Sequence, residues 1–278
     1  MADSSVNSRP AREWASVMKL PLYQIDAFAS KVFTGNPATV VPLGEWLPDE
    51  TMQAIAMENQ LSETAFMIPG EEKVALRWFT PEIEVDLCGH ATLASAHVLF
   101  SELGWDGDSV VFSSRSGDLT VLSLGSQLEM DLPSDELNPA EPEKDRVSAA
   151  LDCRLLELWQ GRDDYMAVVE DESVVRGLKP DIGAVLDLPV RGILVTAPGE
   201  AVEFVSRCFF PAAGIDEDPV TGSAHATMAP YWSEKLGRGV LTAHQVSARS
   251  GEVICEPDGD RVKLRGQALT YLRGEIEI

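Results

Sequence analysis

The feature that most constrains this chain is an internal repeat, because two distant stretches share one order of landmarks. Residues 77–104 and 207–237 both open with Arg-x-Phe-x-Pro, pass an acidic segment, reach a glycine and end in Leu-Gly. The opening motifs are offset by 130 residues and Gly89 and Gly222 by 133, so the second copy carries three extra residues. A duplication of this length predicts two similar halves related by a pseudo-twofold axis.

The helix expected after each glycine is the second informative feature. The first of these helices has almost no polar face, since it contains Ala91, Leu93, Ala94, Ala96, Val98, Leu99 and Phe100. A helix that is apolar nearly all round is buried. Its first N–H groups have no partner within the helix, and with the positive end of the helix dipole they form a site for a carboxylate. Two such ends facing each other would grip a small acid from both sides.

Composition narrows the class of partner. The chain has 22 basic and 45 acidic residues, and its formal charge of −23 argues against nucleic acid and against an anionic membrane as partners. No apolar run approaches the length of a membrane-spanning helix. The four cysteines are widely spaced, without a C-x-x-C pair, so neither a disulfide framework nor a zinc knuckle is suggested and a cytoplasmic location fits best.

Periodicity and turn residues divide the chain. Residues 1–17 read as a flexible N-terminal extension, 18–132 as a first domain, 133–144 as a Pro-rich acidic linker, and 145–266 as a second domain. The final strand, within 267–278, is expected to complete the first domain, since a closed sheet leaves no free edge. We expect an α+β fold, with short strands at the spacing of an antiparallel sheet.

Further elements are expected from the same patterns. A helix is predicted over 48–59 with Met52, Ile55, Ala56 and Met57 on its inner face. Strands are predicted at 22–28, 38–43, 62–68, 74–79, 110–113, 119–124, 128–132, 165–169, 193–196, 202–210, 240–246, 252–255, 261–264 and 269–276, with short helices at 147–151 and 182–186. Gly35-Asn36-Pro37 reads as a turn.

Four groups are candidates for chemistry. Glu63 opens a strand between two hydroxyl residues and is either a solvated edge residue or a functional acid. Cys88-Gly89-His90 heads the first buried helix, the stretch 218–223 heads the second, and His225 lies two residues further on. Asp218 is either a functional group or a helix N-terminal acid. No nucleotide-binding motif is present in the sequence.

Together, six motifs resemble the PhzF-like proteins, the phenazine-biosynthesis type of isomerase with the diaminopimelate epimerase fold. They are Asp26-Ala27-Phe28, Gly35-Asn36-Pro37-Ala38, Ser62-Glu63-Thr64, Arg77-Trp78-Phe79-Thr80-Pro81, Leu87-Cys88-Gly89-His90-Ala91-Thr92 and Glu217-Asp218-Pro219-Val220-Thr221-Gly222-Ser223-Ala224. The resemblance implies two domains, each a barrel-like sheet around a central helix, with a cleft between them. It also implies that Glu63 is the general acid/base, assisted by His90, Asp218 and Ser223, without cofactor or metal.

On this basis we expect a cofactor-independent isomerase that shifts a proton in a small amino or hydroxy carboxylic acid. Backbone N–H groups at the two helix heads would stabilise charge on the substrate, and Asp218 would hold its ammonium or hydroxyl group. The expected substrate-binding residues are Gly89, Ala91, Thr221, Gly222 and Ser223. A homodimer is the commonest expectation for a soluble oligomer of this size.

Two other readings remain. A thiol-dependent racemase would use Cys88, but the second helix head has no thiol, so Cys88 is expected to be a packed small residue. A non-catalytic ligand-binding protein could keep the same fold. His97 and His244 are expected in the core or on the surface, and no residue spacing suggests a metal site.

Overall fold

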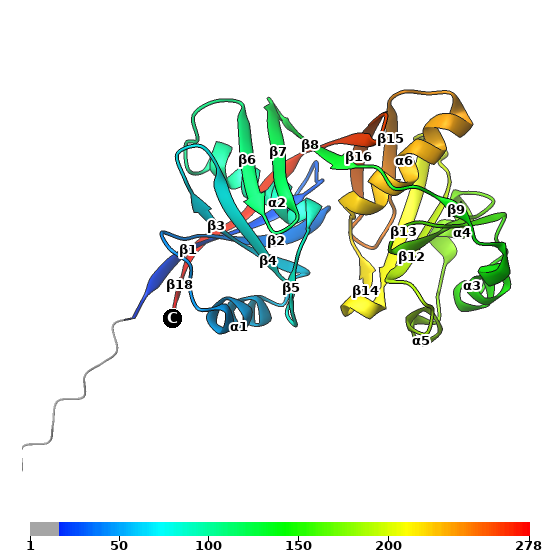
Figure 1. Cartoon of the computed structure of the whole chain (residues 1–278), viewed down its shortest axis with the longest axis horizontal. Helices are drawn as coiled ribbons and strands as arrows, with labels where there is room; N and C mark the ends of the chain where they lie inside the picture. The colour runs from blue at the N-terminus through cyan, green and yellow to red at the C-terminus, as the bar shows by residue number, and fades with distance from the viewer. Residues whose placement is uncertain (1–16) are drawn as a thin grey trace, which may run out of the picture.

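The computed structural model describes residues 17–278, and these form two lobes that lie side by side (Figure 1). All but the last residue of the predicted N-terminal extension, 1–17, lies outside the described residues. Within 17–278, no helix combines the length and the apolar character needed to cross a membrane.

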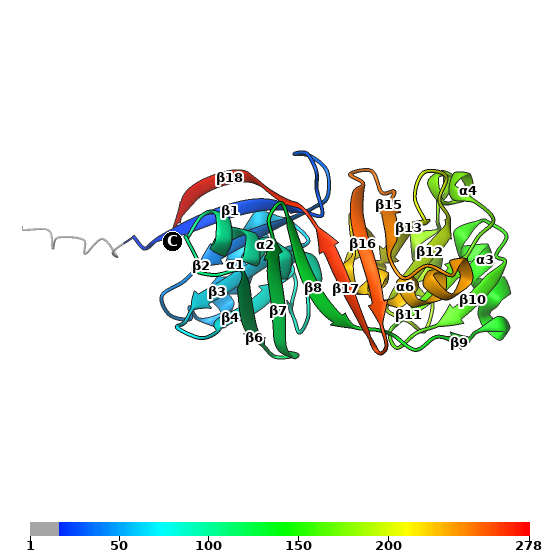
Figure 2. The ribbon, with the colours of Figure 1, turned by 90° about the horizontal axis from the view of Figure 1, so that it is seen from above.

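The first lobe contains nine strands, and the C-terminal strand is one of them. They are β1 (Lys19–Ala27), β2 (Asn36–Pro42), β3 (Glu63–Pro69), β4 (Val74–Phe79), β5 (Glu84–Val85), β6 (Ser109–Ser114), β7 (Gly117–Leu124), β8 (Gln127–Pro133) and β18 (Ala268–Glu277). β18 pairs antiparallel with β1 along its whole length, as the view from above shows (Figure 2). The first and last strands of the described residues therefore lie in the same lobe.

The second lobe contains the other nine strands. They are β9 (Asn138–Pro139), β10 (Glu157–Gln160), β11 (Asp164–Val168), β12 (Gly192–Pro198), β13 (Phe204–Phe210), β14 (Ile215–Asp218), β15 (Leu241–Gln245), β16 (Gly251–Asp258) and β17 (Arg261–Gly266). β17 pairs antiparallel with β8 at the centre of the molecule (Figure 2), so hydrogen bonds join the sheets of the two lobes.

The two lobes repeat one pattern of strand directions. β2 and β3 are parallel, as are β11 and β12, and β4 and β6 are parallel, as are β13 and β15. The remaining neighbours, from β1–β2 and β10–β11 to β7–β8 and β16–β17, are antiparallel. This correspondence confirms the predicted α+β fold of two pseudo-twofold-related units.

Each lobe has a long helix that packs against its sheet. The helices are α1 (Asp49–Asn59), α2 (Gly89–Ser101), α3 (Lys144–Leu151), α4 (Glu172–Gly177), α5 (Ile182–Leu186) and α6 (Gly222–Leu236), with 3-10 turns η1 (Glu141–Glu143) and η2 (Pro211–Ala213). In α2 the buried hydroxyls of Thr92 and Ser95 donate to carbonyls one turn earlier, at 2.6 and 2.7 Å. These bonds allow polar residues to lie in an apolar interior.

The repeated Arg-x-Phe motif has one physical role in both lobes. Arg77 forms two hydrogen bonds to the carboxylate of Glu84, both at 2.7 Å, and Arg207 does the same to Glu217, at 2.7 and 2.8 Å. Each guanidinium also lies over the ring of the phenylalanine two residues later, at 5.2 and 5.1 Å. The bidentate pair ties the acidic loop to the strand in both copies, and the three extra residues of the second copy lie between its members.

Some local expectations were incomplete or wrong. Strands β5, β9, β10 and β14 and helix α4 were not predicted, because two- to six-residue elements are too short to show a hydrophobic period. Met57 was expected on the inner face of α1 but is 55% exposed, whereas Met52, Ile55 and Ala56 are buried. The segment 133–144 crosses from β8 into the second lobe and contains β9 and η1.

Candidate active site

The N-terminal ends of α2 and α6 meet at the junction of the lobes. A Cβ atom placed on Gly89 would lie 3.6 Å from the Cα of Gly222, so the two helix heads are in van der Waals contact. The N-cap residues Cys88 and Thr221 make no side-chain hydrogen bond to the first turns of these helices. The free N–H groups and the positive ends of both dipoles therefore point at the same region.

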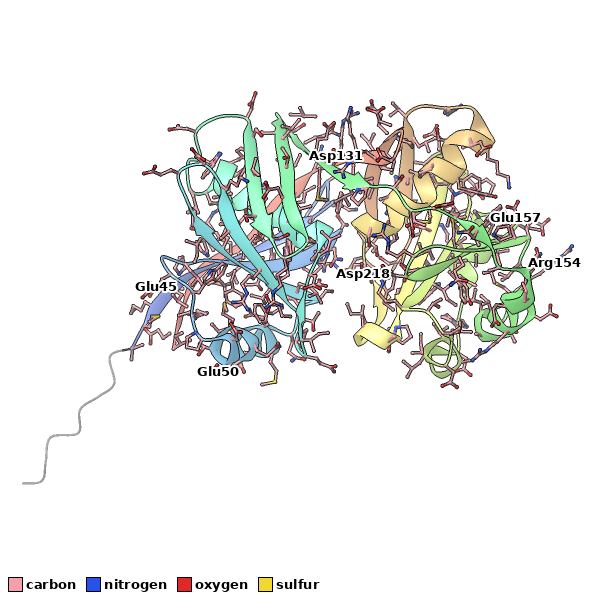
Figure 3. The ribbon with its side chains drawn as sticks, in the orientation of Figure 1. Glu45, Glu50, Asp131, Arg154, Glu157 and Asp218 are labelled. Atoms are coloured by element: carbon pink, nitrogen blue, oxygen red, sulfur yellow. The ribbon has the colours of Figure 1, made fainter. Side chains whose placement is uncertain are left out.

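A cavity of about 470 Å³ opens at this junction. Its lining from the first lobe includes Glu63, Cys88 and His90, and its lining from the second lobe includes Asp218 and Ser223. Figure 3 shows Asp218 on the side of the second lobe that faces the first. Five of the residues that the sequence singled out therefore border one space.

Glu63 is the first residue of β3 and is only 8% exposed. Its Oε2 atom lies 3.1 Å from Nε2 of His90, which is 4% exposed. Neither of these two atoms has a hydrogen-bond partner with acceptable geometry among the described residues. A carboxylate oxygen and a ring nitrogen are thus held side by side in a desolvated position, with bonding capacity left for a third group.

The other ring nitrogen of His90 faces the sulfur of Cys88. Nδ1 lies 3.5 Å from Sγ. Burial alone would lower the pKa of His90, but contact with Cys88 and Glu63 outweighs burial and raises that pKa. Burial, reinforced by the negative charge of Glu63, raises the pKa of the Cys88 thiol to about 11, so this thiol is protonated near neutral pH.

Asp218, at the end of β14, is held by side chains from both lobes. Asn36 donates to Oδ1 at 2.7 Å, and the hydroxyl of Thr221 donates to Oδ2 at 2.5 Å. Burial raises the pKa of Asp218 to about 6, against the opposing effect of His90. Gln245, also buried, donates to the backbone carbonyl of Asp218 at 2.7 Å and accepts from the N–H of Thr221 at 2.8 Å.

Asn36 is a site residue that the sequence analysis missed, because Gly35-Asn36-Pro37 reads first as a turn. Its Nδ2 atom is within hydrogen-bond distance of Asp218, of the Val220 carbonyl at 2.9 Å and of His90 Nδ1 at 3.2 Å. It therefore connects the histidine of one lobe with the aspartate of the other. The sequence signal for its importance was its place in the Gly35-Asn36-Pro37-Ala38 motif, which does not show what the amide contacts.

The loop that carries Asn36 is fixed to the second lobe. Arg249 donates to Asp26 at 2.8 Å and to the Gly35 carbonyl at 2.9 Å, and the Gly35 N–H donates to the Ser250 carbonyl at 2.7 Å. Asp26 is almost fully buried, so this charge-assisted contact is largely shielded from solvent. The contact fixes the relative position of the lobes beside the cavity.

Some of the remaining predicted residues line the cavity and others do not. Gly89, Thr221, Gly222 and Ser223 line the cavity, whereas Ala91 is fully buried and is not part of the described lining. His225 also lies outside that lining; its Nδ1 is 2.7 Å from the Thr221 carbonyl, and burial lowers its pKa to about 4.

His97 and His244 contact other regions, with Thr270 at 2.9 Å and Glu252 at 3.2 Å respectively. Neither is among the cavity-lining residues within the described chain.

The outer part of the cavity is lined by charged residues of the second lobe that sequence reasoning did not find. Arg191 forms a bidentate pair with Asp164, at 2.9 and 2.5 Å, and lies over the ring of Phe210 at 5.0 Å. Arg162 lines the cavity and has no ion-pair partner within residues 17–278. These side chains come from turns whose spatial position depends on strand pairing, which local sequence does not reveal.

One group of side chains has the composition of a metal site. Glu63, Cys88 and His90 each offer one ligand atom, and these atoms lie within 4.8 Å of one another. The sequence analysis saw no such spacing, because Glu63 comes from a different strand and joins the other two only through the fold.

Comparison with known proteins gives concordant results. The family model described as phenazine biosynthesis-like protein (PhzC-PhzF) matches residues 25–274. A Pseudomonas aeruginosa protein named uncharacterized isomerase is 47% identical over 262 residues, which cover 94% of this chain and 100% of that protein. A crystal structure of a phenazine biosynthesis protein of the PhzF family from Enterococcus faecalis matches with a TM-score of 0.89 and 45% identity, over 94% of this chain and 100% of that one.

A more distant structure shares the fold alone. The hydroxyproline epimerase from Agrobacterium vitis matches with a TM-score of 0.60 at 10% identity, over 94% of this chain and 93% of that one. The two-lobed fold therefore extends beyond the more similar relatives.

Proposed function

Because this chain belongs to the PhzC-PhzF family of phenazine biosynthesis-like proteins, we propose that it is a cofactor-independent isomerase of a small amino or hydroxy carboxylic acid. Relatives named as isomerases support the reaction class. The observation that carries the proposal is the meeting of Glu63, His90 and Asp218 in one cavity beside two helix N-termini.

The reaction is a proton transfer within the substrate. Glu63 removes a proton from one carbon as general base and, as the resulting acid, returns it to another atom of the same molecule. The transfer is balanced without an external donor, because the proton and the electron pair both stay in the complex. The free Oε2 of Glu63, which has no hydrogen-bond partner among the described residues, is available for this role.

The helix heads stabilise the charge that develops as the proton leaves carbon. The substrate carboxylate lies against the first N–H groups of α2 and α6, near Gly89 and Gly222. Preorganised donors in a desolvated site stabilise such charge more strongly than water does, because they need no reorientation during the reaction. Ser223, at the start of α6, adds a hydroxyl to this region.

Asp218 binds the amino or hydroxyl group of the substrate. Its pKa of about 6 leaves it mostly ionised at neutral pH, so it accepts a hydrogen bond from either group. Asn36 and Thr221 hold the carboxylate in one orientation. His90, in contact with Glu63, orients the substrate or relays the proton.

The alternative in which Cys88 is the base is less well supported. A pKa of about 11 keeps the thiol protonated, and the matching position on the second helix head is Thr221, which is a poor acid. A two-thiol mechanism therefore lacks its second thiol. Loss of activity in Cys88→Ser with full activity in Glu63→Gln would favour the thiol reading instead.

Isotope exchange tests the proposal. Candidate amino and hydroxy acids are incubated in deuterated water with the wild type, Glu63→Gln and the control Glu45→Gln, whose exposed side chain lies far from Asp218 (Figure 3). We expect deuterium incorporation to fall by about 100- to 10,000-fold in Glu63→Gln and to stay unchanged in the control. Undiminished exchange in Glu63→Gln removes Glu63 from the mechanism, and carboxylate binding without any exchange favours a non-catalytic binding protein.

A further inference from the structure

The group formed by Glu63, Cys88 and His90 has a capacity that the proposed proton transfer does not use. All three residues are at least nine-tenths buried, and all three line the cavity. One ligand atom of each, a carboxylate oxygen, a sulfur and a ring nitrogen, lies within 4.8 Å of the other two. Such convergence is uncommon in an apolar core, because unpaired polar atoms are costly to bury.

Two buried atoms of this group also lack hydrogen-bond partners among the described residues. Oε2 of Glu63 and Nε2 of His90 are buried and make no acceptable hydrogen bond to any described residue, although they lie 3.1 Å apart. A buried acceptor left unsatisfied costs about 1–3 kcal/mol unless another group satisfies it. Sγ of Cys88 lies 3.5 Å from Nδ1 of His90, whereas Oε2 of Glu63 lies beside Nε2 of the same ring. A cation bound to Oε2 and Sγ would therefore take one of the two ring nitrogens as its third ligand. It would satisfy the unpaired carboxylate oxygen and border the cavity.

The donor set selects the kind of cation. A thiolate, an imidazole and a carboxylate together suit zinc, whereas calcium and magnesium prefer oxygen ligands alone. Zinc–ligand bonds of about 2.0–2.3 Å place tetrahedral ligand atoms roughly 3.5 Å apart, so separations of up to 4.8 Å need only small side-chain movements. Ionised Cys88 and Glu63 together carry the charge that neutralises a divalent ion.

We propose that Glu63, Cys88 and His90 form a binding site for a zinc-class divalent cation, and that this cation inhibits the protein. On binding, the Cys88 thiol and the His90 ring nitrogen that takes the cation release their protons to solvent, and metal–sulfur, metal–nitrogen and metal–oxygen bonds form. The fourth position of the cation faces the cavity and takes water or a carboxylate. The inhibitory part of this proposal rests on the proposed function, because a cation bound to Glu63 occupies the lone pair that removes the substrate proton.

Metal titration without substrate tests the site. Metal-free, untagged full-length protein is titrated with zinc chloride by calorimetry and with cobalt chloride by absorption spectroscopy. We expect one zinc ion per chain and a sulfur-to-cobalt charge-transfer band. Cys88→Ala should abolish the band and weaken zinc binding by at least about tenfold, because one of three protein ligands is lost.

The control is another free cysteine. Cys153 is partly exposed and lies outside the cavity lining within the described chain, so Cys153→Ala should keep both the band and the affinity. Cys88→Ser keeps the side-chain volume if Cys88→Ala fails to fold, and it should lose the band as well. A band that is absent from the wild type, that survives both Cys88 changes, or that disappears in Cys153→Ala overturns the site.

The inhibitory role is measured separately. Equimolar zinc should stop deuterium exchange, and a chelator should restore it. Exchange that persists with zinc bound overturns inhibition. Failure to exchange any acid in the absence of zinc would count against the proposed isomerase, whereas the titrations would still decide whether the metal site exists.

Discussion

The two lobes share one strand pattern, yet of the matching strands β3 and β12 only β3, in the first lobe, starts with an acidic side chain. β3 begins at Glu63 and β12 at Gly192, and in each lobe the next residue pairs with the phenylalanine of the Arg-x-Phe motif. A Cβ on Gly192 would lie 2.3 Å from the Phe209 carbonyl oxygen and 2.4 Å from a ring carbon of Phe210. The duplicated fold therefore provides two matching positions, Glu63 and Gly192. In the second lobe the Phe210 ring and the β13 backbone fill the space that an acidic side chain at position 192 would need.

The hairpin loops next to these strands also differ between the lobes, in length and in what they contact. Asn36 and Arg162 occupy matching positions, each two residues before the one that pairs with Glu63 or Gly192. The first hairpin loop, 28–35, is long and docks on the second lobe, whereas the turn 161–163 is short and lines the cavity. The region around Asn36 is thus closed by a contact between the lobes, whereas the matching region around Arg162 is open to the cavity.

The largest expected effect comes from a substitution at Gly192, the second-lobe position that matches Glu63. Gly192→Ala forces a side-chain atom against the backbone of β13, which cannot move without breaking the sheet. We expect a loss of roughly 3 kcal/mol or more in the free energy of unfolding, measured by chemical denaturation. Gly44→Ala is the control, because a Cβ there would meet no described atom within 4 Å. Equal stability of the two variants would show that the second lobe tolerates a side chain at this position.

The repeat explains how much of the architecture can be predicted from the sequence. The Arg-x-Phe motif recurs because the arginine must bind a carboxylate of the acidic loop in each lobe, and this local rule predicts both halves. The apolar helix after Gly89 likewise predicts burial. Glu63, His90 and Asp218, chosen from sequence, all border the cavity. Whether they act as proposed is a question for the variants.

Other parts of the site depend on long-range register and could not be predicted. Asn36 reaches Asp218 across 182 positions of sequence, and Arg249 reaches Asp26 across 223. Nothing in the tripeptide around Asn36 or in the turn around Arg162 specifies which strand will lie opposite. Such contacts follow from the pairing of whole strands, which only the folded chain establishes.

The next effect concerns Asp218, whose counterpart in the first lobe is the apolar Val85. Burial raises the pKa of Asp218 from 3.8 to about 6, so the folded state binds this proton more tightly than the unfolded state. The contribution to stability is therefore complete below about pH 4 and is lost as the pH rises to about 6. The expected change between pH 4 and 7 is roughly 2 kcal/mol, and Asp218→Asn should remove it.

The measurement is the difference in unfolding free energy between wild type and Asp218→Asn at several pH values. Taking a difference cancels the titration of other groups. Asp106→Asn, at an exposed position, is the control for the removal of a surface carboxylate. A flat difference for Asp218→Asn would mean that its carboxylate is stabilised in the folded state as well as it is in water.

A smaller effect is expected at Asn36, in the region that the contact between the lobes closes. Asn36→Ala removes a donor to Asp218 and the link to His90, and we expect exchange activity to fall by about 10- to 100-fold, as for a lost hydrogen bond to a charged group. Because the bond from Asn36 lowers the pKa of Asp218, its loss should move the acidic limb of the pH–activity profile above pH 6. Asn138→Ala, at an exposed position, is the control; an unmoved limb would contradict the coupling.

The smallest effect concerns Arg162, the open counterpart of Asn36. Its guanidinium lines the outer cavity without an ion-pair partner in the described chain. If the substrate is the carboxylic acid proposed above, this charge should attract it as it arrives. Arg162→Ala should raise KM by about fivefold or less and leave kcat unchanged, since an exposed charge contributes about 1 kcal/mol at most. The effect should shrink at high salt, because the interaction is screened. Arg154→Ala is the control, because it removes an equal charge at the outer edge of the same lobe (Figure 3). An identical rise in KM in that variant would show that Arg162 acts only through the net charge of the protein and not through its position at the cavity.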